Sequence, residues 1–379
     1  MNFRVVLVGG GSGGHFYPLI AITEALTDVS RASGNTLELF YMGPEPYDQV
    51  SLDREGIRFV RVAGGKTRRY RSLLNFFDIF KTLWGVVEAV LKLFWIYPDA
   101  VMSKGGFTSV PVVFAAWFLR IPIVIHESDS VPGRANLFGS KFAKYIAISY
   151  PEVAEHFSKK KKERLALTGI PIRKVFLEPR EDDPHEVLNI DPAYPLILVI
   201  GGSLGAERVN TLILQALDEL LPKYTIIHQA GANLIDAVTE TAKTLITDQT
   251  LLSRYHPTGF VDSTVLVHAY RAAAVIIARG GSTSIFEIAL AGKPSIIIPI
   301  PEEISHDQRT NAYAYARTGA ATVMEEGNLR DGLLAAEIMR IMDDQAAYAE
   351  MAGAAKVFAP RDAATKIARI LFTIGEEHA

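Results

Sequence analysis

The chain contains no cysteine among its 379 residues. Disulfides, thiolate metal sites and a cysteine nucleophile are therefore excluded, and the composition fits a reducing compartment. The chain also lacks an excess of basic charge, because 39 Lys and Arg residues face 42 Asp and Glu residues, a formal net charge of −3. This near balance argues against a general nucleic-acid-binding protein, which carries a clear basic excess.

Long apolar runs are missing as well. A membrane-spanning helix needs roughly 20 consecutive apolar residues. The two nearest runs are 83–97, interrupted by Glu88 and Lys92, and 110–125, interrupted by an arginine. The apolar run at the N-terminus is short and contains Arg4, so it is not typical of a signal peptide. We expect a soluble or surface-attached protein.

What the sequence does contain is a recurring pattern of a short apolar run, then glycines, then a segment with helical periodicity. Hydrophobic residues make up 49% of the chain, enough for a sizeable core. Short apolar runs bounded by glycine are typical of buried parallel strands, and their alternation with helices predicts βαβ units. The strands predicted in this way lie at 5–8, 99–102, 121–125, 196–200, 275–277 and 295–300.

The pattern occurs twice, on either side of a polar stretch. We predict an α/β protein with two Rossmann-like, doubly wound parallel-sheet domains and a cleft between them. The first domain is expected at 1–165 and the second at 166–357, with a last helix, about 358–379, that packs back on the first domain. In such sheets ligands bind at the carboxyl ends of the strands, where the glycine loops lie.

The first glycine loop, Gly9 to Gly14, directly follows a strand and opens a helix. Glycine permits a sharp turn and a close approach to a ligand, and a helix N-terminus suits phosphate. The spacing alone fits either a dinucleotide site or a strand–helix turn without a ligand. His15 follows at the mouth of the helix, where the dipole should lower its pKa and keep the imidazole neutral. A neutral imidazole that faces a cleft can act as a general base.

Two similar segments lie in the second half. In 201–206 the backbone amides and the Ser203 hydroxyl could hold a pyrophosphate. In 279–287 the Glu287 carboxylate could accept hydrogen bonds from a sugar diol. It could equally form a capping box with Ser284, three residues earlier, which would be purely structural. The spacing alone leaves both interpretations open.

Taken in order, these segments resemble the MurG family of glycosyltransferases, glycosyltransferase family 28. The ordered set runs from residue 4 to 321 and is specific, although no single motif decides. The motifs in the first domain are Gly10 to His15 with Pro18, Gly105-Gly106-Phe107, and His126-Glu127 followed by Val131-Pro132-Gly133 and Asn136. Those assigned to the second are Gly169 to Arg173, Gly201 to Ala206, Gly259-Phe260, Arg279 to Glu287, Ala291 to Pro294, and Asp307-Gln308.

The resemblance implies the GT-B fold and an inverting enzyme that transfers GlcNAc from UDP-GlcNAc to the C4 hydroxyl of the MurNAc sugar of lipid I. The product would be lipid II, for peptidoglycan synthesis. Two alternatives stay open, a transferase for another lipid such as diacylglycerol and an isomerase similar to UDP-GlcNAc 2-epimerase. A non-catalytic binding protein is a third, against which the intact His15 and donor loops argue.

The resemblance also assigns roles to residues. His15 is the expected catalytic base, Glu127 a weaker candidate, and Arg173 the diphosphate clamp, because a planar guanidinium suits phosphate. No metal or cofactor is expected, because the sequence has no Asp-x-Asp run and UDP-GlcNAc is a substrate. The residues expected to bind the donor are Ser12, Gly13, Gly14, Asp129, Arg173, Ser203, Val261, Ser282, Thr283, Ser284, Glu287, Asp307 and Gln308; those expected to bind the acceptor are Gly11, Gly105, Gly106 and Asn136.

Three positions depart from the family pattern. Ser128-Asp129 stands where Gln-Asn is common, Leu204 replaces a glutamine, and Asp307 replaces Gln or His. Asp129 exchanges an amide donor for a negative charge beside an anionic substrate, so we expect the contacts at 128–129 to differ from those of the family. These changes indicate a divergent member with the same chemistry.

Residues 66–97 combine basic and aromatic side chains, which suits an anionic membrane interface. The alternative is a core helix behind a solvated basic loop. With the lipid substrate, the segment predicts peripheral attachment to the cytoplasmic face of the cell membrane, near other cell-wall synthesis proteins. The four lysines at 159–162 are a second candidate. The residues concerned in 66–97 are Lys66, Arg68, Arg69, Arg71, Phe76, Phe77, Phe80, Trp84, Phe94, Trp95 and Tyr97.

Overall fold

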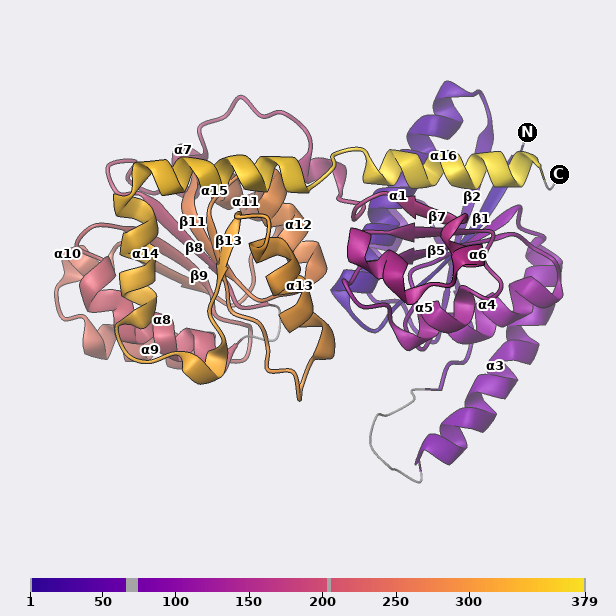
Figure 1. The fold of residues 1–379 in the computed structure, drawn as a ribbon, viewed down its shortest axis with the longest axis horizontal. Coiled ribbons are helices and arrows are strands. Elements are labelled where there is room, and N and C mark those ends of the chain that lie inside the picture. Colours follow the sequence, from indigo (N-terminus) through magenta and orange to yellow (C-terminus); the bar gives the residue numbers. More distant parts are fainter. Residues whose placement is uncertain (1, 66–73, 203–205, 378–379) are drawn as a thin grey trace. The chain divides into compact units, whose positions relative to one another are not determined.

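The computed structural model describes residues 2–65, 74–202 and 206–377, except the side chains of 74–77 and His306. The chain forms two compact units (Figure 1). The first comprises Met1–Lys174 and Pro360–Ala379, and the second comprises Val175–Ala359. The first unit thus extends beyond residue 165, because a short strand at Leu165–Leu167 pairs with the sheet of that unit.

The first unit contains a parallel sheet of seven strands in the order β3-β2-β1-β4-β5-β6-β7. The order reverses between β1 and β4, so the carboxyl ends of these two strands form the switch point at which such sheets bind ligands. The strands are β1 (Asn2–Val8), β2 (Thr36–Gly43), β3 (Arg58–Arg61), β4 (Ala100–Ser103), β5 (Ile123–Glu127), β6 (Tyr145–Ile148) and β7 (Leu165–Leu167).

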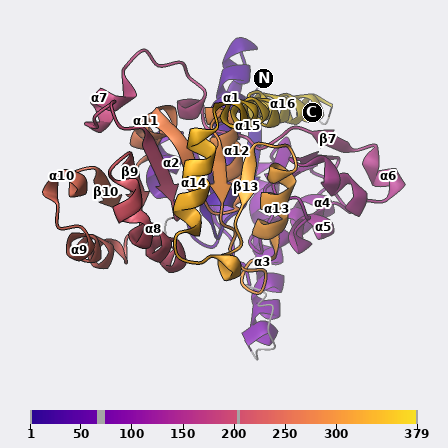
Figure 2. The same cartoon turned by 60° about the vertical axis from the view of Figure 1, so that its left-hand side comes forward.

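Helices cover both faces of this sheet. On one face α1 and α16 pack together, and on the other α4 contacts both α3 and α5 (Figures 1 and 2). The helices are α1 (Gly13–Ala32), α2 (Gln49–Arg54), α3 (Leu74–Ile96), α4 (Ser109–Phe118), α5 (Arg134–Gly139), α6 (Lys159–Lys162) and α16 (Ala363–Glu376), with a 3-10 helix at Pro151–His156.

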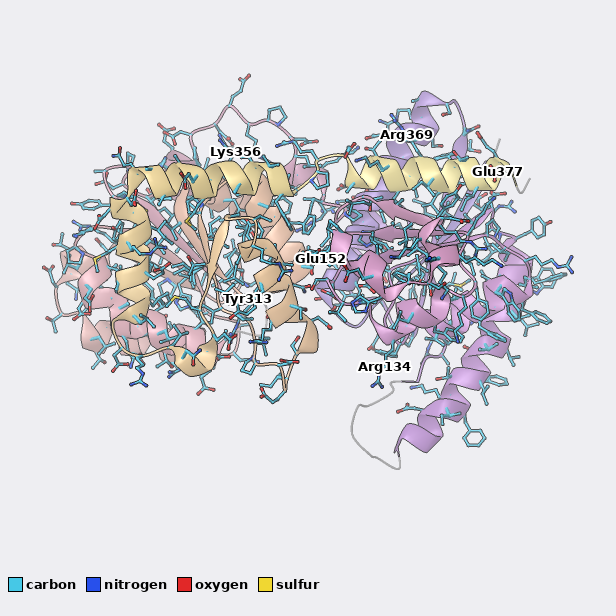
Figure 3. The ribbon with its side chains drawn as sticks, in the orientation of Figure 1. Arg134, Glu152, Tyr313, Lys356, Arg369 and Glu377 are labelled. Carbon is cyan, nitrogen blue, oxygen red and sulfur yellow. The ribbon has the colours of Figure 1, made fainter. Side chains whose placement is uncertain are left out.

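The C-terminal helix α16 belongs to the first unit because its apolar face completes the core of that unit. Phe372 stacks on Phe3 of β1 with ring centroids 4.3 Å apart. Gly375 lies so close to the Phe3 ring that a Cβ atom there would come within 2.1 Å of it. Glu377, labelled in Figure 3 just after the helix, forms an ion pair with Lys144, the residue before β6.

The second unit repeats the arrangement with six parallel strands in the order β10-β9-β8-β11-β12-β13. The prediction of two Rossmann-like parallel sheets is confirmed. The strands are β8 (Leu196–Ile200), β9 (Thr225–Gln229), β10 (Tyr255–Thr258), β11 (Ala273–Ala278), β12 (Ser295–Ile297) and β13 (Ala321–Val323). The helices are α7 (Pro184–Leu188), α8 (Glu207–Leu220), α9 (Ile235–Leu245), α10 (Gln249–Leu252), α11 (Ser263–Ala272), α12 (Ser282–Ala291), α13 (His306–Ala316), α14 (Leu333–Asp343) and α15 (Gln345–Phe358).

Among the helices of the described ranges, none combines the length and the hydropathy that crossing a bilayer requires.

Candidate active site

Two glycine loops meet at the switch point of the first sheet. Gly11, after β1, has a φ of +93°, and Gly106, after β4, has a φ of +80°, a region that side chains rarely adopt. A Cβ atom on Gly106 would lie 3.0 Å from the carbonyl oxygen of Gly10. Glycine is therefore required both for the turns and for the close approach of the two loops.

His15 lies in the first turn of α1 and is half-buried. Its Nδ1 atom lies 2.8 Å from the hydroxyl of Ser12, the residue that precedes the helix. When Nδ1 carries the hydrogen and donates it to Ser12, Nε2 is left as a proton acceptor. Burial, followed by the positive charge of Lys104, lowers the pKa of His15 to about 4. The imidazole is therefore neutral near pH 7, for a reason other than the helix dipole that the sequence suggested.

Glu127 is the second predicted catalytic residue, and only 3% of it is exposed. One carboxylate oxygen accepts hydrogen bonds from the Gly133 amide and from Asn136 Nδ2, each 2.9 Å long, and the other accepts from the Asp129 amide at 3.1 Å. Burial, together with Asp129, raises the pKa of Glu127 to about 7. Because three donors occupy the carboxylate, Glu127 is better suited to hold the 127–136 segment than to accept a substrate proton.

Lys104 is a site residue that the sequence analysis missed. It directly follows β4, it is 1% exposed, and its ammonium group donates to the Ser128 hydroxyl. Its Cβ atom packs against Gly9, where a side chain would come within 2.7 Å of it. Burial lowers the pKa of Lys104 to about 8, against the opposing effect of Glu127 and Asp129. The sequence does contain a signal that could have identified Lys104, because this lysine stands between an apolar strand and the glycine pair Gly105-Gly106.

Asn136, predicted to bind the acceptor, is 5% exposed on α5. Its Nδ2 atom donates to the His126 carbonyl at 3.2 Å as well as to Glu127. Its Oδ1 atom is buried without a partner, and a Cβ atom on Gly105 would lie 2.7 Å from it. Asn136 therefore orients the Glu127 carboxylate, and its side chain packs closely against Gly105 of the second glycine loop.

Arg173 lies in the first unit, although the sequence analysis placed it in the second domain. Its guanidinium lies over the ring of Tyr17 on α1, 4.5 Å from the ring centre. The segment is fastened to α1, because the Lys174 amide donates to Glu24 at 2.8 Å and its ammonium pairs with Asp28 at 2.5 Å. The predicted phosphate clamp thus belongs to the same unit as His15.

In the second unit, helix α12 begins at Ser282 after the N-cap residue Gly281. Ser282, Thr283 and Ser284 therefore form its first turn, where backbone N–H groups are available to an anion. Because Ser284 is inside the helix and is not its N-cap, the capping box with Glu287 is wrong. Glu287 is half-buried and accepts a hydrogen bond from the Tyr270 hydroxyl at 3.3 Å. The diol-binding interpretation of Glu287 stays a prediction.

Asp307 and Gln308 lie in the first turn of α13. The side-chain oxygen of Gln308 accepts hydrogen bonds from the amides of Gly280 and Ile300, both 3.2 Å long. Since this oxygen joins the loops that follow β11 and β12, Gln308 can offer only its NH₂ group to a sugar hydroxyl.

Of the predicted donor residues in the first unit, Gly13 and Gly14 are the first two residues of α1. Two donor positions of the second unit remain, Val261 and Ser203. Val261 is 6% exposed, and the next residue, Asp262, caps α11 by accepting from the Thr264 amide. Ser203, with the departure at Leu204, lies outside the described residues.

Comparison with known proteins identifies the family. Residues 5–148 match the glycosyltransferase family 28 N-terminal domain, and residues 196–367 match the corresponding C-terminal domain. The chain is 33% identical over 376 residues to the UDP-N-acetylglucosamine--N-acetylmuramyl-(pentapeptide) pyrophosphoryl-undecaprenol N-acetylglucosamine transferase of Treponema pallidum (strain Nichols), a match that covers 98% of this chain and 96% of that protein. It is 32% identical over 350 residues to the protein of the same name from Clostridium tetani, with 92% of each chain covered.

Solved structures share the fold. The crystal structure of Acinetobacter baumannii MurG matches with a TM-score of 0.72 at 23% identity, covering 98% of this chain and 99% of that one. UDP-GlcNAc 2-epimerase from Neisseria meningitidis bound to UDP-GlcNAc matches with a TM-score of 0.69 at 14% identity, covering 98% and 100%. The family matches and the full-length relatives show that this chain belongs to glycosyltransferase family 28 and is a glycosyltransferase of the GT-B fold.

Proposed function

We propose that this N-acetylglucosaminyltransferase transfers GlcNAc from UDP-GlcNAc to the C4 hydroxyl of MurNAc in lipid I, the undecaprenyl-pyrophosphoryl-MurNAc-pentapeptide, and so forms lipid II for peptidoglycan synthesis. The names of the full-length relatives support these substrates. The observation that carries the proposal is His15, whose imidazole is held neutral beside two glycine loops.

The chemistry is a single displacement with inversion. The acceptor oxygen attacks the anomeric carbon while the bond from that carbon to the UDP oxygen breaks and its electron pair leaves with UDP. His15 Nε2 accepts the proton of the attacking hydroxyl, which a base with a lowered pKa does without first losing a proton of its own. In this proposal Glu127 and Asn136 keep the 127–136 segment in place, and Gly11, Gly105 and Gly106 let the acceptor diphosphate approach the backbone.

The donor contacts in this proposal come from carboxylate, amide and guanidinium groups. Glu287 holds the ribose hydroxyls, Asp307 and Gln308 hold the GlcNAc hydroxyls, and the amides at the start of α12 and Arg173 stabilise the departing diphosphate. Since Arg173 and the N–H groups at the start of α12 can stabilise the charge of the phosphates, we propose that catalysis needs no metal or cofactor. Treatment with EDTA should then leave the transfer rate unchanged, and a loss that Mg²⁺ restores would contradict this point.

The described part of α3 supports attachment to a membrane. The side of α3 that faces the first unit carries small residues in close contact with it. A Cβ atom on Gly85 would come within 1.9 Å of the Ala63 carbonyl oxygen, and Ala89 is fully buried. The outer side of α3 is apolar and exposed, and Figures 1 and 2 show the helix extending from the first unit. The exposed side chains of the helix are Ile79, Phe80, Leu83, Trp84, Val87, Leu91, Phe94 and Trp95, and Tyr97 is exposed just after its end.

An exposed apolar helix face of this kind lies well at the boundary between headgroups and acyl chains. We propose that this face binds the cytoplasmic surface of the cell membrane peripherally, with Lys159–Lys162 of α6 as a second, basic contact. Lys66, Arg68, Arg69 and Arg71, predicted for the same surface, lie outside the described residues, as do the side chains of Phe76 and Phe77.

The decisive experiment supplies radiolabelled UDP-GlcNAc with lipid I or a short-chain analogue, with diacylglycerol, or without an acceptor. Label should pass to lipid I alone. Preferential transfer to diacylglycerol would contradict the proposal that lipid I is the acceptor. The fold shared with UDP-GlcNAc 2-epimerases makes an isomerase the second candidate. Formation of UDP-ManNAc in the absence of an acceptor would favour it over transfer.

A further inference from the structure

A side-chain hydrogen bond joins two neighbouring helices of the second unit at the predicted donor site. Tyr270 lies near the end of α11, and Glu287 lies in α12, which packs against α11 (Figure 1). The Tyr270 hydroxyl donates to one carboxylate oxygen of Glu287 at 3.3 Å. Because Tyr270 is only 4% exposed, packing holds its ring in place. The half-buried carboxylate of Glu287 is therefore tied to a side chain that is itself fixed.

The segment at the start of the second unit holds this end of α11. Phe176, in a short 3-10 helix, meets the ring of Tyr270 edge to face, with ring centroids 6.0 Å apart. Arg271, the next residue of α11, donates to the carboxylate of Asp182 at 2.5 Å and to its carbonyl oxygen at 2.6 Å. Contacts at both ends of the segment 176–182 therefore fix the turn of α11 that carries Tyr270.

An oriented carboxylate is an advantage when the ligand is a diol. A glutamate side chain has several rotatable bonds and loses conformational freedom when a ligand fixes it. A carboxylate that is already held in its bound orientation avoids part of this cost. A carboxylate also accepts about four hydrogen bonds, so one from Tyr270 is compatible with two from a vicinal diol.

We propose that Tyr270 is a positioning residue of the donor site, whose hydroxyl holds the Glu287 carboxylate in the orientation that accepts both hydroxyls of the ribose. This inference rests on the proposed function, in which Glu287 holds the ribose, and adds to it the residue that orients Glu287. It follows that Tyr270 favours nucleotides with an intact diol, although its own contact is with Glu287.

The test compares the binding of UDP with that of 2′,3′-dideoxy-UDP, which lacks both ribose hydroxyls, by calorimetry on the full chain. The wild type should bind UDP about tenfold more tightly than the dideoxy compound. Tyr270→Phe keeps the ring that packs on Phe176 and removes only the hydroxyl. It should weaken UDP binding by about threefold to tenfold and leave the affinity for 2′,3′-dideoxy-UDP unchanged. Equal weakening of both compounds, or of neither, would overturn the proposal.

A matched control removes a tyrosine hydroxyl elsewhere in the same unit. The Tyr348 hydroxyl, on α15, donates to the Ala274 carbonyl at 2.9 Å, so Tyr348→Phe also loses one hydrogen bond. This variant should keep the wild-type preference for UDP over 2′,3′-dideoxy-UDP. A preference reduced as far as in Tyr270→Phe would mean that any lost hydroxyl in this unit has the same effect, and would contradict a specific role for Tyr270.

A double-mutant cycle with Glu287→Ala supplies a second measurement. Since Tyr270 acts through Glu287 in this proposal, adding Tyr270→Phe to Glu287→Ala should change the UDP affinity by less than about twofold. A further loss as large as that of Tyr270→Phe alone would show that the two residues act independently, and the proposal would fail.

Kinetics separate this inference from the proposed function. With a saturating lipid I analogue, Tyr270→Phe should raise KM for UDP-GlcNAc and leave kcat within about twofold, because the ribose hydroxyls take no part in the bond changes. If the wild type shows the nucleotide preference but transfers nothing to lipid I, the proposed acceptor is wrong and the role of Tyr270 stands. If lipid I is the acceptor and Tyr270→Phe binds both nucleotides as the wild type does, the role of Tyr270 is wrong and the proposed function stands.

Discussion

The two units share a parallel-sheet architecture, but two histidines with lowered pKa values, one in each unit, have different hydrogen-bond partners. His15 in the first unit uses one ring nitrogen for the Ser12 hydroxyl and keeps the other as an acceptor. His228 on β9 of the second unit is held at both nitrogens, by the Tyr255 hydroxyl at 2.8 Å and by Asn210 at 3.0 Å. Burial lowers the pKa of both, to about 4 for His15 and about 3 for His228. A shifted pKa therefore does not mark a catalytic base unless a ring nitrogen is left to react.

The two units also differ in the burial and the hydrogen-bond partners of their other site residues. The first places Lys104 and Glu127 out of solvent, with their pKa values moved to about 8 and about 7. In the second, the half-buried Glu287 accepts from a hydroxyl, and Gln308 bonds to backbone amides. The first arrangement gathers buried charged groups near the catalytic candidate His15, and the second suits the recognition of a hydroxyl-rich ligand.

The largest effect expected from this contrast is that of His15→Gln. Loss of a general base lowers a rate by about 10²- to 10⁴-fold, so kcat should fall by this amount with saturating substrates. The thermal midpoint should hardly move, because the ring makes one side-chain hydrogen bond and is half-buried. Initial rates with labelled UDP-GlcNAc measure this. His185→Gln, on α7 of the second unit, is the matched control and should retain the rate; wild-type turnover in His15→Gln would remove His15 from its role.

His228→Ala should have the opposite effects: it should lower the stability of the protein and leave kcat unchanged. It removes both hydrogen bonds of a fully buried ring and leaves the Asn210 oxygen and the Tyr255 hydroxyl without that partner. Such a change costs about 1–3 kcal/mol of unfolding free energy. Urea denaturation should detect the loss, while the folded fraction should turn over normally. A normal stability combined with a large loss of kcat would invert the comparison between the two histidines.

Glu287→Ala should weaken donor binding by about tenfold, the effect of losing one or two hydrogen bonds to a charged acceptor. The change should appear in KM for UDP-GlcNAc and in UDP affinity by calorimetry, with kcat little affected. Glu240→Ala on α9 is the control, because its side chain is 73% exposed. Unchanged UDP affinity in Glu287→Ala would reject the diol-binding interpretation.

The smallest effect concerns the exposed face of α3. Val87→Glu places a charge on this face and should reduce binding to anionic liposomes several-fold, since it removes part of the apolar surface that the membrane would cover. Val357→Glu on α15 is the matched control, because it makes the same change at an exposed valine of the other unit. Co-sedimentation measures both. Equal binding by the two variants would count against α3 as the membrane contact.

The sequence predicts the parts of this structure that depend on local pattern. The apolar runs located strands such as β1, β4 and β8, because buried parallel strands are apolar on both faces. The position of His15 after a glycine loop predicted a neutral imidazole, and the structure agrees in direction. The cause is different, since burial and Lys104 depend on which segments the fold brings together.

What the sequence could not predict depends on packing or on competing local signals. Lys104 resembles any loop lysine until Gly9 and the 127–129 segment enclose it. The start of α12 was uncertain because Gly281 and Ser284 are both acceptable N-caps, and the structure uses Gly281. Arg173 was placed in the wrong unit because β7, which joins its segment to the first sheet, is only three residues long.

The most direct test of the account is an NMR titration of the His15 ring in the wild-type protein. Its ordinary pKa is 6.5, and the folded value is about 4, so the stabilising contribution of the neutral ring is complete above pH 6.5 and is lost as the pH falls toward 4. We predict that His15 stays neutral throughout the physiological range and titrates near pH 4. A His15 that titrates at or above pH 6.5 would contradict the claim that burial and Lys104 lower its pKa and hold the ring neutral.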